Sequence, residues 1–216
     1  MKKFRLFRLA RWVMIAAVAA ATSYFVLSSA RQGSLRESNS RNLGQLAAAL
    51  QQYHERYKTF PPAYLTAQDG TPMHSWRILV IPFLDGGADI YARYNFAQPW
   101  NGPDNRALSN SMPSAFGDPF NPQPGMTRYC AIVGSRTMWP GHLAVRINDI
   151  RDGSAMTYML TEGPQAIDWL RPKDVSMAEF AGYGAKPPLA REIGRSRRTF
   201  AVARADGNVD ELDTGV

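Results

Sequence analysis

The chain has 216 residues, a single cysteine and a formal net charge of +7, so the cysteine count excludes any intramolecular disulfide. Five of its 25 basic residues precede Trp12, which leaves 20 basic against 18 acidic residues, a net charge of +2, in the rest of the chain. The excess positive charge is therefore mostly N-terminal and is poor evidence for nucleic-acid binding. Residues 31–216 suffice for one hydrophobic core.

Residues 12–30 form an uncharged apolar segment directly behind the basic residues 1–11. The segment is about as long as the shortest helices that span a bilayer. The positive-inside rule then predicts a cytoplasmic N-terminus (residues 1–11), a single transmembrane anchor in the inner membrane (residues 12–30) and an exported domain (residues 31–216). The alternative is a secretory signal, because residues 28–30 (Ser-Ser-Ala) resemble a cleavage site. We favour the anchor, because helical patterning continues beyond residue 30.

The helical pattern extends from the apolar segment to Tyr57. Its later part carries an apolar face at three- and four-residue spacing, formed by Leu43, Leu46, Ala47, Leu50, Tyr53, His54 and Tyr57. Pro61 restricts Phe60 to extended backbone and ends the helix. Residues 38–42 include weak helix formers, so the sequence allows a local kink there.

Short elements follow the long helix. Residues 75–84 predict a helix with Ser75 as N-cap, with a strand over 78–81 as the alternative, and residues 88–94 predict another helix. Residues 95–126 are rich in proline and glycine, which predicts loops with a brief helix over 105–112. Strands are predicted at 128–133, 155–161, 167–170, 199–204 and 209–212.

Asp206 and Gly207 separate the last two of these strands and predict a hairpin with Gly207 at positive φ. We expect Phe200 and Val202 to face the helix stripe of residues 43–50. The complete pattern predicts an α+β fold, in which one long N-terminal helix, half in the membrane and half amphipathic, packs on an antiparallel sheet.

Several motifs occur in an order typical of one family. They are Asn42-Leu43-Gly44-Gln45-Leu46, Phe60-Pro61-Pro62, His74-Ser75-Trp76-Arg77, Pro99-Trp100-Asn101-Gly102-Pro103, Tyr129-Cys130-Ala131-Ile132-Val133-Gly134, Ile150-Arg151-Asp152-Gly153-Ser154, Trp169-Leu170-Arg171-Pro172-Lys173-Asp174 and Ala205-Asp206-Gly207. Over roughly residues 31–212 the chain resembles the pilin-like, secreted domain-of-unknown-function family 1559. The resemblance implies a type IV pilin-like or pseudopilin-like fold, an exported location and no established activity.

Two features of that family are missing here. Its members usually start with a prepilin leader, a Gly cleavage site followed by Phe-Thr-Leu-Ile-Glu, but no Gly precedes the apolar segment and no Glu lies within it. The resemblance implies that this Glu pairs with the N-terminus of the neighbouring subunit in a filament, since burying it in lipid without a partner would be costly. Because both the Gly and the Glu are missing, we expect no filament assembly. The family also has a C-terminal His-x9-Asp-Gly motif, and Ser196 occupies the histidine position here.

Residues with chemically useful side chains are scattered along the chain. His54, His74 and His142 lack metal-ligand spacing, and Cys130 has no cysteine neighbour, so we predict no metal, no cofactor and no enzymatic activity. The aspartates at positions 149, 152, 206, 210 and 213 fit turns better than a calcium loop. The candidate binding residues are His74, Trp76, Trp100 and Trp169, for which packing roles are the competing interpretation.

These observations predict a membrane-anchored envelope protein of pseudopilin-like type that acts through protein–protein contacts. Its expected partners are the lipid bilayer, through residues 12–30, and secretion-type or pilus-type envelope proteins, but no nucleic acid. The alternative is an extracellular solute-binding or glycan-binding module that uses the loops between Trp100 and Gly125.

Overall fold

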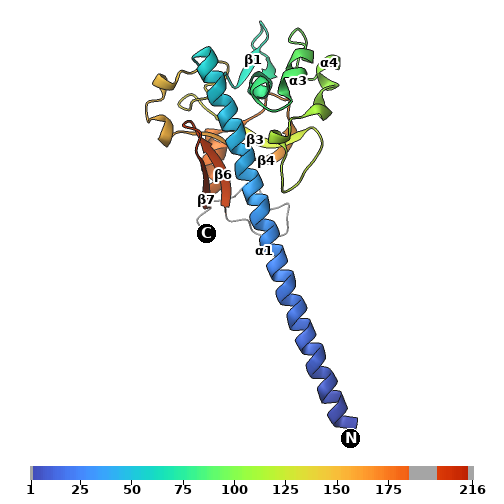
Figure 1. The fold of residues 1–216 in the computed structure, drawn as a ribbon. Coiled ribbons are helices and arrows are strands. Elements are labelled where there is room, and N and C mark those ends of the chain that lie inside the picture. The colour runs from blue at the N-terminus through green and yellow to red at the C-terminus, as the bar shows by residue number, and fades with distance from the viewer. Residues whose placement is uncertain (1, 185–198, 214–216) are drawn as a thin grey trace. The chain divides into compact units, whose positions relative to one another are not determined.

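The computed structural model describes residues 2–184 and 199–213, with backbone alone for residues 2–11. The chain divides into two compact units, Met1–Ser38 and Asn39–Val216. The long helix α1 (Lys2–Tyr57) contributes to both units, as Figure 1 shows.

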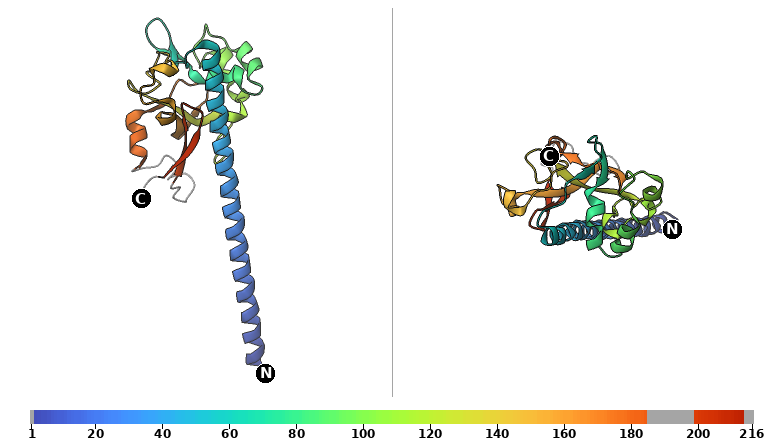
Figure 2. Two further views of the ribbon diagram at one scale, coloured as in Figure 1. Left: turned by 60° about the vertical axis from the view of Figure 1, so that its left-hand side comes forward. Right: turned by 90° about the horizontal axis from the view of Figure 1, so that it is seen from above.

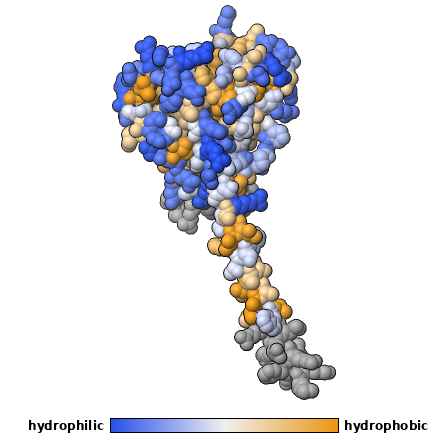
Figure 3. Space-filling model, viewed as in Figure 1, coloured by the Kyte–Doolittle hydropathy of each residue, from blue (hydrophilic) through white to orange (hydrophobic). Residues whose placement is uncertain are grey.

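The first unit is the N-terminal part of α1. By length and composition this helix could cross a membrane, and no residue of its most apolar stretch is buried. Figure 3 shows orange, hydrophobic side chains along this part of the helix. The hydroxyl groups of Thr22, Ser28 and Ser29 donate hydrogen bonds to main-chain carbonyls three or four residues earlier. These polar groups are therefore satisfied within the helix, as a hydrocarbon environment requires.

In the second unit, α1 continues without a break through the residues where the sequence allowed a kink. The asparagines there make tertiary hydrogen bonds. Asn39 donates to the Glu162 carboxylate and accepts a 2.8 Å hydrogen bond from the Tyr129 hydroxyl, and Asn42 donates to the Gly117 carbonyl at 2.8 Å. Tertiary contacts thus outweigh the low helix propensity of these residues.

Short helices lie between α1 and the sheet and between the strands of the sheet. They are α2 (Trp76–Val80), η1 (Ile81–Phe83), α3 (Gly87–Arg93), α4 (Pro103–Arg106), η2 (Ser109–Ser111), η3 (Ser114–Phe116), η4 (Ile147–Asp149), η5 (Ser154–Met156), α5 (Met177–Ala181) and η6 (Gly182–Gly184). The helix predicted from residue 75 is confirmed as α2 and η1, and the Ser75 hydroxyl caps it by accepting from the Arg77 amide. The helix predicted at 88–94 is α3, and the brief helix predicted over 105–112 is divided between α4 and η2.

The sheet has five strands in the order β5-β3-β4-β6-β7. The strands are β3 (Met126–Val133), β4 (Tyr158–Asp168), β5 (Val175–Ser176), β6 (Thr199–Arg204) and β7 (Val209–Asp213), and a separate hairpin joins β1 (Tyr64–Thr66) to β2 (Pro72–Ser75). Neighbours in the sheet are antiparallel except β3 and β5, so the sheet is mixed rather than purely antiparallel. The fold is α+β, with the second part of α1 packed against this sheet (Figure 2).

The strands predicted at 155–161 and 167–170 are wrong in their boundaries. Residues 154–156 form η5, and residues 167–168 are the end of the single strand β4. The β3–β4 register shifts between Thr127 and Tyr129, opposite Gly163 and Pro164. This irregularity places a Gly-Pro pair, ordinarily a turn signal, inside a strand.

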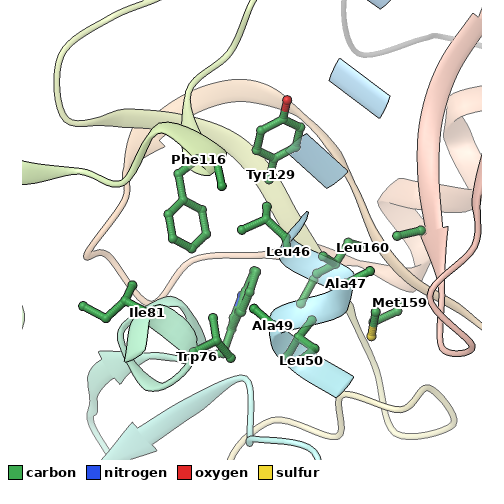
Figure 4. Close-up of a cluster of buried hydrophobic side chains, with 14 of the residues drawn as sticks. Leu46, Ala47, Ala49, Leu50, Trp76, Ile81, Phe116, Tyr129, Met159 and Leu160 are labelled. Atoms are coloured by element: carbon green, nitrogen blue, oxygen red, sulfur yellow. The ribbon is translucent and has the colours of Figure 1, made fainter. Parts of the chain in front are cut away.

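The predicted hairpin of β6 and β7 is confirmed, but the face assigned to it is wrong. Ala201 and Ala203 pack in the main core with Leu46 and Leu50 of α1. Figure 4 shows these two leucines beside Trp76 and Phe116. Phe200 and Val202 instead belong to a second cluster with Cys130, Ile167, Val175 and Tyr183. Small alanine side chains let the helix approach the strand closely, while the larger residues pack on the opposite face of the sheet.

Candidate functional site

Three of the four predicted binding residues lie in the interior. Trp76 and Trp169 are fully buried, and both contact Phe116, with ring centroids 6.0 and 5.9 Å away. His74 is also buried, whereas Trp100 remains partly exposed. The structure therefore brings Trp76 and Trp169 together as core residues, and Trp100 alone of the four is partly exposed.

The contacts of His74 are those of a residue that supports the fold. Its Nδ1 atom lies 2.9 Å from the Tyr94 hydroxyl, and its ring meets Tyr94 and Phe96 edge to face. Burial lowers the pKa of His74 below its ordinary value, which favours the neutral imidazole at pH 7. Burial likewise raises the pKa of Tyr94, so this pair stays uncharged.

A buried ion pair joins several of the sequence motifs. The Arg77 guanidinium, with no exposed surface, lies 2.9 Å from Asp174 and donates to the Ser75 hydroxyl at 2.8 Å and to the Tyr129 carbonyl at 3.1 and 2.8 Å. Asp174 also accepts hydrogen bonds from the Ala131 amide and the Trp76 indole, at 2.8 and 3.1 Å. Both charged groups of the pair are hydrogen-bonded to other residues, and the pair links α2 to β3 and to the segment 169–174.

The loop that carries Trp100 is organised by Asn105. This buried amide donates hydrogen bonds to the carbonyls of Asn95, Gln98 and Pro99. The Trp100 amide donates to the Met73 carbonyl at 2.9 Å, and the Arg171 guanidinium lies 5.9 Å from the centre of the Trp100 ring. Trp100 and Arg171 thus form a small aromatic and cationic surface on an ordered loop.

The other residues weighed as ligands have local structural contacts. His54 is half-buried with its ring 4.7 Å from Phe60. Asp149 accepts from the Arg146 amide and Asp206 from the Asn208 amide, both at 3.0 Å, while Asp210 pairs with Arg204. In the described part of the chain, no three His, Cys, Asp or Glu residues are close enough to hold a metal ion. Ser196 lies outside the described residues.

Sequence reasoning missed a cluster of partly exposed aromatic residues in the second unit. We call it the tyrosine face, and it consists of Tyr53, Tyr57, Phe83, Tyr91 and Phe96. Tyr57 and Phe96 are 52% and 37% exposed. Ring centroids lie 4.5 Å apart between Tyr53 and Tyr57, 6.1 Å between Tyr53 and Phe83, and 5.5 Å between Tyr91 and Phe96.

The phenol groups of the tyrosine face lie close enough to affect one another's pKa values. Burial raises the pKa of Tyr53 and of Tyr91, and the neighbouring phenol of Tyr57 raises both further. The Arg56 guanidinium lies 5.7 Å from the centre of the Tyr57 ring. The face therefore presents aromatic rings, hydroxyl groups and one cation, a combination suited to contact with another macromolecule.

Comparison with known proteins gives one match. A family described as a protein of unknown function (DUF1559) matches residues 28–186. No curated protein and no solved structure matches the chain.

Proposed function

The chain belongs to the DUF1559 family of proteins of unknown function, and we propose that it is a membrane-anchored envelope protein that acts through protein–protein contacts. In this proposal residues 12–30 cross the inner membrane once, with the N-terminus in the cytoplasm and the globular unit outside. The protein is pseudopilin-like in build and performs no catalysis itself.

Three observations support the anchor. No residue in the apolar stretch of α1 is buried, its hydroxyl groups at Thr22, Ser28 and Ser29 bond within the helix, and five cations precede it. Exposed apolar surface of this length is unfavourable in water and favourable in lipid. The cations favour the cytoplasmic side for the N-terminus.

The tyrosine face is the observation that carries the proposed protein–protein contact. Tyrosine and arginine are enriched among the residues that dominate binding energy at interfaces, and the large ring of tyrosine buries much area at low conformational cost. Here Tyr53 and Tyr91 are half-buried, so they support the more exposed rings of Tyr57 and Phe96. Partner contact would bury this preorganised surface with little loss of side-chain freedom.

Interior polar residues support a non-catalytic interpretation. The strongest candidates for chemistry by residue type, Arg77, Asp174 and His74, are committed to hydrogen bonds that hold the fold. These are the contacts of structural groups, because each residue is hydrogen-bonded to another part of the chain and does not line an open cleft.

Site-specific photocrosslinking in native membranes tests the contact. A photoreactive residue at Tyr57 should give a discrete adduct, whereas the same residue at Met156, which is 75% exposed on η5, should not. The pair of substitutions Tyr91→Ala and Phe96→Ala should remove the Tyr57 adduct. Equal crosslinking at both positions would contradict the proposal. Competition by oligosaccharides would instead favour the glycan-binding alternative, for which the Trp100 and Arg171 surface is the available site.

The anchor is tested separately by carbonate extraction and protease treatment. We expect the full-length chain to stay in the membrane pellet, and its globular unit to be cleaved only when protease reaches the extracytoplasmic side. Release of full-length protein by carbonate would contradict the anchor, and a mature chain that lacks residues 1–30 would establish the signal-peptide alternative.

A further inference from the structure

We propose that Arg31 and Arg36 bind the phosphate groups of anionic phospholipids at the extracytoplasmic surface of the bilayer. The inference rests on the proposed anchor and adds a specific lipid partner to it. Both residues belong to the first unit, immediately beyond the apolar segment that ends at Ala30.

The helical geometry places both side chains at the depth of lipid headgroups. At about 1.5 Å per residue, Arg31 lies roughly 2 Å and Arg36 roughly 9 Å beyond the last apolar residue. The headgroup layer adds about 5–8 Å to each side of the hydrocarbon core. A long arginine side chain can extend along the helix towards this layer, so both guanidinium groups reach the phosphates. Arg41, roughly 16 Å beyond Ala30, lies outside it.

The two arginines are available for an external anion. Both are exposed, and within the described residues neither forms an ion pair or side-chain hydrogen bond. Arg77 and Arg204, by contrast, pair with Asp174 and Asp210. A guanidinium group presents a planar set of donors that matches two phosphate oxygens, and the match is stronger than for a lysine ammonium.

Charge complementarity selects anionic over zwitterionic lipids. The segment 31–41 contains three arginines and one acidic residue, Glu37, so it is positive overall. A zwitterionic headgroup carries its own cation beside the phosphate, whereas an anionic headgroup leaves a net negative charge to attract this segment. Arg31 and Arg36 would thereby fix the depth of α1 at the membrane surface.

Energy transfer from a dye beside the two arginines measures this preference. Ser34 is exposed, so Ser34→Cys can be labelled in the full-length protein, while the native Cys130 is buried and its pKa is raised to about 12. The labelled protein is reconstituted in phosphatidylcholine vesicles with a tenth phosphatidylglycerol. Acceptor dyes are carried on the headgroup of either lipid. Because the N-terminal cations would lie about 30 Å away across the hydrocarbon core, a short-range dye pair reports the Arg31 side.

The expected result is transfer to phosphatidylglycerol about threefold above transfer to phosphatidylcholine, decreasing with added salt. The double variant Arg31→Gln and Arg36→Gln should reduce the ratio to about one. Arg93→Gln, which alters an exposed arginine of α3, should leave it unchanged.

Two results would overturn the inference. If the ratio is one in the parent protein, or is unchanged in the double variant, the arginines do not select anionic lipid although the anchor stands. If the protein fails to float with vesicles after carbonate treatment, the anchor fails and the lipid site fails with it.

Discussion

Substitution of Gly207 isolates the backbone strain of the β6–β7 hairpin from side-chain packing. The Gly207 amide donates to the Arg204 carbonyl at 3.0 Å, and the Arg204 amide donates to the Asn208 carbonyl at 2.8 Å. Gly207 has φ of 93°, whereas Asp206 does not adopt a positive φ. The loop is therefore a three-residue turn with glycine alone in the left-handed position.

The structure indicates how much stability a substitution of Gly207 should cost. A Cβ atom at Gly207 would meet no other heavy atom within 4 Å, so any loss of stability comes from the φ angle alone. Gly207→Ala should lower the free energy of unfolding by about 1–2 kcal/mol. The β-branched Gly207→Val should approach about 3 kcal/mol. Gly182 provides the matched control, since its Cβ position is also open but its φ is −73°.

Urea unfolding of the full-length protein in detergent, followed by tryptophan fluorescence, measures these effects. Trp76, Trp139 and Trp169 are fully buried and report the second unit. Gly182→Ala should leave the midpoint unchanged or raise it, because alanine restricts the unfolded chain. Equal midpoint shifts for Gly207→Val and Gly182→Ala, or no shift for Gly207→Val, would refute the strain argument.

Five further outcomes are expected. Arg77→Met should cost about 3–5 kcal/mol in the same urea assay, because it leaves Asp174 buried without its cation. Ala203→Leu, at a fully buried strand position facing α1, should cost about 1–3 kcal/mol through overpacking. Lys58→Gly should raise the melting temperature by relieving about 1 kcal/mol of strain at φ 61°, and an unchanged temperature would contradict this. Cys130 should resist iodoacetamide at pH 8 until urea unfolds the protein. Because burial raises the pKa of Cys130 to about 12, stability should decline as pH rises above the ordinary thiol pKa of 9.0, measured by urea titration at each pH.

Features controlled by neighbouring residues could be predicted from the sequence. Pro61 lies just after α1, Ser75 caps α2, and Gly207 adopts the positive φ of the hairpin. Each prediction depends on interactions that span a few positions along the chain. The order of a long helix, short helices and strands followed from the same local information.

Features set by distant contacts could not be predicted. Gly163 and Pro164 interrupt the strand pattern, yet β4 continues past them because the register with β3 shifts there. The alternation of β6 gives two faces, Ala201 with Ala203 and Phe200 with Val202, and we expected the wrong one, Phe200 with Val202, to face α1. Hydrophobicity favours burial of both faces, and only the close approach of α1 decides which face accepts alanine.

The candidate site shows the same limit. Tryptophans were selected for their capacity to bind ligands, but the sequence does not reveal that Trp76 and Trp169 both pack against the same buried phenylalanine, Phe116. Arg77 was missed, although a single cation within an apolar run is a recognisable sign of a buried, paired charge. The tyrosine face combines residues from α1, η1, α3 and the loop after α3 that become neighbours only in the folded chain.

The asparagines of α1 show how one helix can serve two environments. Asn39 and Asn42 are unfavourable in an isolated helix, but they hydrogen-bond to Tyr129, Glu162 and Gly117 in the second unit. Before Asn39, the hydroxyl groups described above bond back to the helix itself. Polar groups in the apolar part must be satisfied internally, because lipid offers no partners, whereas those from Asn39 onwards can bind the sheet. The cited internal hydrogen bonds extend to Ser29 and the tertiary ones begin at Asn39, so the proposed anchor ends and the globular unit begins between these two residues.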